Sequence, residues 1–146
     1  ATIPVTTQCT KNNGCSDGMA EFVCPLCATI HLSGSTITLT SCAMAVMVMT
    51  NQSIGFGKMF PFILMLGVTM VAAPGVPGGT VMASLGLITG VLMFDDAGTA
   101  LMLAIFALQD SFGTACNVTG DGALTLILTG YADRHKIAVA ESTAEE

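Results

Sequence analysis

Residues 59–94 read MFPFILMLGVTMVAAPGVPGGTVMASLGLITGVLMF and contain no charged side chain. The apolar runs at its two ends, 59–71 and 81–94, would each form a helix of roughly 20 Å, which is short for a hydrocarbon core of roughly 30 Å. Between them, residues 72–80 include two prolines and three glycines and cannot continue a regular helix. Two short apolar arms around such a turn predict a re-entrant helical hairpin.

Charge is scarce in the rest of the chain as well. Of 146 residues, 52% are hydrophobic and 10% are charged, whereas a soluble domain carries roughly 25% charged residues. Between Glu21 and Lys58, His31 is the only titratable side chain other than cysteine, and a polar tail at 132–146 holds four of the acids. This composition predicts an all-α membrane protein in contact with the lipid bilayer. It offers no basic patch for nucleic acid, and we expect a fragment of a longer protein.

The stretch 16–50 predicts a transmembrane helix that is broken in the middle. Polar and flexible residues interrupt it at 31–35, and we expect helix to resume at Thr36. Carbonyl groups freed by a break at membrane depth need protein, water or a bound ion as partner, and secondary transporters place ligand sites at such breaks. Cys24 and Cys27 have CxxC spacing, but without a second pair we interpret them as small hydrophobic residues rather than a zinc or redox site.

Residues 97–131 predict one long final transmembrane helix. Asp110, Thr114, Asn117 and Asp121 follow one another at spacings of four, three and four, which places them on one face. Small polar residues often hold membrane helices together. A carboxylate at bilayer depth, however, costs at least about 2.5 kcal/mol and usually marks an ion or substrate path. We therefore favour a functional role for both aspartates.

Four short motifs follow one another along the chain: Ala1-Thr2-Ile3-Pro4-Val5-Thr6, Pro25-Leu26-Cys27-Ala28-Thr29-Ile30, Gly75-Val76-Pro77-Gly78 and Asn117-Val118-Thr119-Gly120-Asp121. Together, over roughly residues 1–131, they resemble the C-terminal transport core of glutamate-transporter-type symporters, the dicarboxylate/amino-acid:cation symporter family. The resemblance implies that 1–13 are the second arm of an inner re-entrant hairpin and that 59–94 are the outer one. It also implies a homotrimer of the full-length, multi-pass protein in the cell membrane.

The same resemblance implies two sites for Na⁺, the transported coupling ion. The first would be formed by the Asp121 carboxylate with the backbone carbonyls of Cys27, His31 and Asn117. The second would use backbone carbonyls alone, those of Thr29, Leu32, Met70, Val71 and Ala73. A carboxylate together with carbonyl oxygens suits a hard cation.

For the substrate, the resemblance implies that Asp110 meets the α-amino group and Asn117 the α-carboxylate. The remaining residues of the expected substrate site are Ser35, Val76, Gly78, Gly113 and Thr114. Gly113 stands where family members with acidic substrates place an arginine, and Ser33 replaces an acid that serves a third sodium site. Both departures are similar to the serine/threonine branch of the family, and they favour a small neutral amino acid as substrate.

Several alternatives stay open at this stage. His31 replaces an asparagine, and its side chain is either a polar filler at the break or a group that makes transport sensitive to pH. The substrate could instead be an acidic amino acid or a C4-dicarboxylate. A channel or a structural membrane subunit fits the broken helices less well. An enzyme is less expected still, because no nucleophile elbow, phosphate loop or metal cluster occurs.

Overall fold

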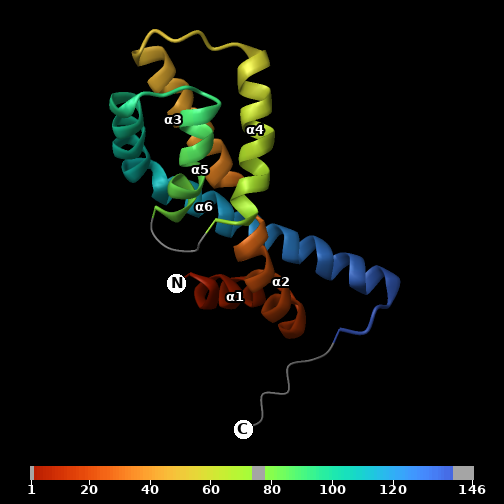
Figure 1. Cartoon of the computed structure of the whole chain (residues 1–146). Helices are drawn as coiled ribbons and strands as arrows, with labels where there is room; N and C mark the ends of the chain where they lie inside the picture. Colours follow the sequence, from red (N-terminus) through yellow and green to blue (C-terminus); the bar gives the residue numbers. More distant parts are fainter. Residues whose placement is uncertain (1, 74–77, 140–146) are drawn as a thin grey trace. The chain divides into compact units, whose positions relative to one another are not determined.

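The computed structural model describes residues 2–73 and 78–139, so Val76 and the rest of the hairpin turn at 74–77 lie outside the described residues. Throughout the described part the regular secondary structure is helical, which confirms the all-α class. The helices, labelled in Figure 1, are α1 (Ile3–Asn12), α2 (Asp17–Ile30), α3 (Ser33–Met49), α4 (Phe56–Val71), α5 (Gly79–Gly90) and α6 (Asp96–His135).

The chain divides into two compact units. The first comprises Ala1–His31 and Asn117–Glu146, and the second comprises Leu32–Cys116. Helix α6 contributes residues to both, because the division falls within it. Each unit is held together by its own contacts.

In the first unit, α1 packs against α2 across a tight turn. The turn contains Gly14 at a φ of 95°, a conformation that costs glycine little. The Lys11 Nζ donates a hydrogen bond to the Glu21 Oε1 at 2.6 Å and lies 3.5 Å from the Asp17 Oδ1. The hydrogen bond with Glu21 is the main reason why the pKa of Lys11 is raised above its ordinary value. The ammonium group therefore keeps its charge and joins α1 to α2.

The break between α2 and α3 is shorter than the sequence predicts. Helix α2 ends at Ile30 and α3 begins at Ser33, three residues before the predicted start. The Leu32 carbonyl accepts hydrogen bonds from the backbone N–H of Thr36 at 3.0 Å and from its Oγ1 at 3.1 Å. Because a serine is well tolerated in a first helical turn, Ser33 and its neighbours are helical here.

The second unit is a helical hairpin packed on a third helix. Helices α4 and α5 contact each other, and α3 contacts both (Figure 1). Gly78 precedes α5 at a φ of 73°, which an L side chain adopts only with strain. At the other end of the hairpin, the Lys58 Nζ donates to the Leu92 carbonyl at 2.9 Å. Helix α5 ends at Gly90, four residues before the predicted end, and Met93 has a φ of 59° in the turn that follows.

A single apolar core fills the second unit. Its fully buried members come from every helix of the unit and include Leu39, Val46, Met47, Phe62, Leu66, Ile88, Leu92 and Met102. Outside the core, large apolar side chains are exposed, among them Val68 and Leu108. Two helical stretches, 17–49 and 96–135, are long and apolar enough to cross a membrane. Exposed apolar side chains suit a surface that meets lipid.

Substitution of Phe62 tests the packing of the core. Phe62→Ala should lower the free energy of unfolding by about 3–5 kcal/mol, because it leaves a cavity among fully buried neighbours. Phe60→Ala is the matched control, since Phe60 lies on the same helix with 48% of its surface exposed. Thermal unfolding of the full-length protein in detergent, followed by circular dichroism, measures both. Equal losses in the two variants would contradict the described core.

Candidate functional site

Asp121 is a buried carboxylate of the first unit, and it is paired with His31. The His31 Nδ1 lies 2.8 Å from the Asp121 Oδ1, and the side chains are 23% and 4% exposed. When Asp121 is ionised its carboxylate can only accept hydrogen bonds, so in that state the His31 Nδ1 carries the proton and donates it. The sequence expectation placed both residues at one cation site, and the structure brings them together through the imidazole ring of His31.

Gly120 makes room for that ring. A Cβ at this position would overlap the His31 Cε1 and would lie 3.2 Å from each ring nitrogen. Contacts this close do not occur between a real Cβ and a side chain without displacement, so the ring can lie over α6 only because residue 120 has no side chain. This role of Gly120 was not predicted from the sequence. A glycine inside a helix, directly before a buried acid, was the available signal.

A series of buried side-chain hydrogen bonds, the polar chain, ends at the backbone carbonyl of Asp121. The Thr125 Oγ1 donates to the Asp121 carbonyl at 2.7 Å. The Cys24 Sγ lies 3.7 Å from the Thr125 Oγ1 and donates to the Thr10 Oγ1 at 3.5 Å. Contacts among side chains of α1, α2 and α6 thus fix the position of Asp121.

The cysteines of the CxxC pair are free and buried. Cys24 takes part in the polar chain described above, and the Cys27 carbonyl accepts the backbone N–H of His31 at 2.7 Å. Within residues 2–73 and 78–139, no group of three or more His, Cys, Asp or Glu side chains is placed to hold a metal ion.

The residues expected at the first sodium site all lie in the first unit. Cys27 is in the last turn of α2, His31 follows that helix, and Asn117 is buried on α6 one turn before Asp121. These residues offer one carboxylate and three backbone carbonyls, of which that of Cys27 accepts the His31 N–H at 2.7 Å and that of Asn117 lies in the interior of the continuous helix α6. A hard cation prefers oxygen ligands of these kinds.

The residues expected at the second sodium site are divided between the units. Thr29 belongs to the first unit, and the other four belong to the second. Leu32 immediately precedes α3, Met70 and Val71 are the last residues of α4, and Ala73 follows them. The Met70 carbonyl accepts the backbone N–H of Ala73 at 3.1 Å. All four are therefore found at helix ends.

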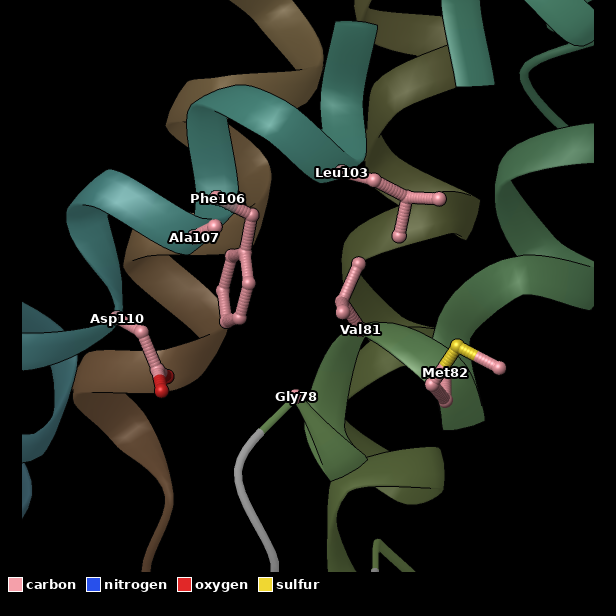
Figure 2. A pocket seen from close by; sticks show the side chains of 7 residues that line it. All are labelled: Gly78, Val81, Met82, Leu103, Phe106, Ala107 and Asp110. Carbon is pink, nitrogen blue, oxygen red and sulfur yellow. The ribbon is translucent and has the colours of Figure 1, made fainter. Parts of the chain in front are cut away.

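A cavity of about 420 Å³ lies between α5 and α6 in the second unit. We call it the α5–α6 cavity, and Figure 2 shows the residues that line it: Gly78, Val81, Met82, Leu103, Phe106, Ala107 and Asp110. It brings together two of the expected substrate residues, Gly78 from the start of α5 and Asp110 from α6. The other five could not be recognised from the sequence, because apolar residues on a membrane helix face either lipid or protein.

Among the described residues of the second unit, the other expected substrate residues do not line this cavity. Ser35 is buried in the first turn of α3, and the Thr114 Oγ1 donates to the Asp110 carbonyl at 3.0 Å. Gly113 is at a close approach of α6 to α3. A Cβ on Gly113 would lie 3.0 Å from the Thr38 Oγ1 and 3.5 Å from the backbone of Gly34.

Two helical stretches are long and apolar enough to span a bilayer, and one of them is broken at His31, whose side chain meets the buried carboxylate of Asp121. This combination is typical of helical membrane proteins of the transporter class. The comparison with protein families specifies the class further. The model of the sodium:dicarboxylate symporter family matches residues 1–131, and the chain belongs to this family.

Relatives with two kinds of name are similar to the chain. The neutral amino acid transporter B(0) of Homo sapiens is 29% identical over 135 residues, which are 92% of this chain and 25% of the relative. The protein of that name from Macaca fascicularis is 28% identical over 97% of this chain and 26% of its own length. The human excitatory amino acid transporter 1 is 27% identical over 94% of this chain and 25% of its own length.

The chain thus spans about a quarter of the length of these curated relatives, at 25% to 26%. No solved structure gives a significant match to it. The relatives are transporters by name, and the family is one of sodium-coupled symporters.

Gly120 provides a test of the His31 contact. Gly120→Ala should lower the stability of the full-length protein by about 1–3 kcal/mol, because the new methyl group displaces the ring. Gly130→Ala is the control on the same helix, where a Cβ meets nothing within 4 Å, and it should raise stability by about 0.5–1 kcal/mol. Thermal unfolding in detergent measures both changes.

A double variant separates this contact from a general helix effect. In the His31→Asn background the ring is gone, so Gly120→Ala should cost much less there than in the wild type. Additive losses would show that residue 120 acts independently of His31.

Proposed function

We propose that this chain is part of the transport core of a symporter that carries a small neutral amino acid together with sodium across the cell membrane. In this proposal the full-length protein is a multi-pass homotrimer, and residues 59–94 are its outer re-entrant hairpin. Among the described residues that line the α5–α6 cavity, Asp110 alone is charged. That observation carries the choice of substrate, because a second carboxylate on the substrate finds no cation there.

Gly113 supports the same choice. Family members with acidic substrates are expected to have an arginine here, whose planar fork binds a carboxylate through two hydrogen bonds. In this chain the backbone of α6 instead approaches Thr38 and Gly34 of α3 closely, and a first side-chain atom already makes a tight contact. The relatives named for neutral amino acids agree with this reading, and the excitatory amino acid transporters keep acidic amino acids and dicarboxylates as the alternative substrates.

For sodium, we propose that Asp121 supplies the only fixed negative charge of the first site. His31 contacts one carboxylate oxygen, Oδ1, and in this proposal the other oxygen binds the cation. The carbonyls of Cys27, His31 and Asn117 complete this set, and those of Thr29, Leu32, Met70, Val71 and Ala73 form the second. An imidazole that donates from Nδ1 is neutral unless Nε2 is protonated as well, so it leaves the attraction of Asp121 for the cation in place.

Asp121→Asn should abolish sodium-dependent uptake, because a desolvated cation would then have only neutral ligands. Asp133→Asn, at an exposed position on the same helix, removes the same charge and should leave uptake unchanged. Uptake of labelled alanine by the full-length protein in proteoliposomes, with sodium or choline outside, measures the effect. Retained sodium dependence in Asp121→Asn would exclude this carboxylate as the ligand.

Competition among substrates tests the neutral-substrate proposal. An unpaired carboxylate at a dry site costs about 2–5 kcal/mol of binding free energy. Aspartate and succinate should therefore need concentrations roughly 30-fold higher, or more, than alanine, serine or threonine to inhibit uptake equally. The measurement is inhibition of labelled alanine uptake by each compound in the wild-type, full-length protein. If aspartate or succinate inhibits best, a cation outside the α5–α6 cavity serves the second carboxylate and the alternative substrates apply.

A further inference from the structure

The polar chain of the first unit is buried along its whole length. Thr10 of α1 is 2% exposed, Cys24 of α2 is 1% exposed and Thr125 of α6 is 0% exposed. At one end, the Thr10 Oγ1 donates to the Thr6 carbonyl at 2.8 Å. At the other end, the Thr125 Oγ1 donates to the Asp121 carbonyl at 2.7 Å. Both hydroxyl protons are therefore directed to backbone carbonyls.

Cys24 lies between the two hydroxyls and has one proton for two contacts. Its Sγ donates to the Thr10 Oγ1 at 3.5 Å and lies 3.7 Å from the Thr125 Oγ1. A thiol is a weak donor with a single hydrogen, so it does not bind both hydroxyls strongly at the same time. The sulfur atom therefore contributes mainly by its size, because it fills the space between Thr10 of α1 and Thr125 of α6.

These contacts restrict the rotation of α6 about its own axis. Thr125 follows Asp121 by four residues, and side chains at this spacing lie on the same face of a helix. Gly122 adds a second point of approach, since a Cβ there would lie 3.5 Å from the Thr10 Oγ1. Because both contacts are on the part of α6 that carries Asp121, they determine where the carboxylate of Asp121 is placed.

We propose that Cys24 is a positioning residue of the sodium site. Through Thr125 it sets the rotation of α6 and thereby the position of the Asp121 carboxylate relative to the other ligands. The proposal rests on the proposed function, in which Asp121 binds sodium together with the carbonyls of Cys27 and His31. Cys24 and Cys27 are three residues apart on α2, so this helix carries both a ligand and the residue that positions the carboxylate.

Ion selectivity is the property that distinguishes positioning from stability. Selectivity between two hard cations depends on the size and rigidity of the set of oxygen ligands. Li⁺ is smaller than Na⁺ and needs its ligands closer. When the Asp121 carboxylate is held less firmly, it can approach the smaller ion, so the preference for Na⁺ falls together with the affinity. A residue that only stabilises the fold would leave this preference unchanged.

Two buried cysteines allow a matched experiment. Cys24 and Cys42 are 1% and 4% exposed, and Cys42 belongs to the apolar core of the second unit. In the full-length protein, Cys24→Ala should raise the sodium concentration needed for half-maximal binding about threefold or more, and it should lower the preference for Na⁺ over Li⁺ by a similar factor. Cys42→Ala removes the same atom and should lower stability without changing either value.

Sodium binding is measured without a substrate. Sodium chloride or lithium chloride is titrated against the unfolding temperature of the full-length protein in detergent, with choline chloride keeping the ionic strength constant. An ion that binds the folded protein raises this temperature in proportion to its occupancy, and the midpoint of the rise gives the affinity.

Variants of Thr125 keep the test valid if Cys24→Ala folds poorly. Thr125→Val removes the hydroxyl from a side chain of similar shape and should weaken sodium binding about threefold or more, whereas Thr125→Ser keeps the hydroxyl and should stay within about twofold of the wild type. Thr129→Val is the control. The Thr129 Oγ1 donates to the Thr125 carbonyl at 2.9 Å, the same kind of bond one turn further along α6, and its loss should leave sodium binding unchanged.

The outcomes distinguish this inference from the function on which it rests. If sodium does not stabilise the wild-type protein, or stabilises Asp121→Asn equally well, the proposed sodium site fails and the inference fails with it. If Asp121→Asn loses sodium binding but Cys24→Ala binds both ions as Cys42→Ala does, only the inference is overturned. Additive losses in the Cys24→Ala, Thr125→Val double variant would overturn it as well, because residues that act through one contact are not additive.

Discussion

Backbone hydrogen bonding at the break between α2 and α3 is the constraint on which the rest of this structure depends. In an apolar surrounding, an N–H or carbonyl without a partner costs several kcal/mol. The chain limits this cost by keeping the break to His31 and Leu32 and by adding the hydroxyl of Thr36 as a second donor to the Leu32 carbonyl. At this break the imidazole of His31 meets the Asp121 carboxylate, with Nδ1 2.8 Å from Oδ1, and it is at this carboxylate that we propose a cation site.

The sequence predicts the helical class well because one property dominates it. Charged residues are absent over long stretches. In such a chain the backbone N–H and carbonyl groups must form their hydrogen bonds within helices. Boundaries are less predictable where local signals conflict. Residues 33–35 combine glycine with serine and suggest a longer break, but the contacts of Leu32 with Thr36 extend α3 to Ser33. Residues 91–94 are apolar and suggest continued helix, yet the chain turns at Met93.

The candidate site, like the fold, is only partly predictable from the sequence. The two aspartates of α6 could be recognised from the sequence because an acid on an apolar helix is costly and needs a reason. The contact of the His31 ring with Gly120 could not be predicted, since it joins residues that are far apart in the chain and depends on the ring's orientation. The α5–α6 cavity could not be predicted either, because apolar side chains carry no signal that distinguishes a cavity wall from a packed interface.

The bond between the Lys58 ammonium and the Leu92 carbonyl has a consequence for how the hairpin can vary. It joins positions that are 34 residues apart in the sequence, at the open end of the two arms. Because the contact is only 2.9 Å long, a slide of α4 past α5 by one helical turn, about 5.4 Å, would break it. The arms can therefore vary in sequence at other positions, but the register of α4 against α5 is fixed at this end.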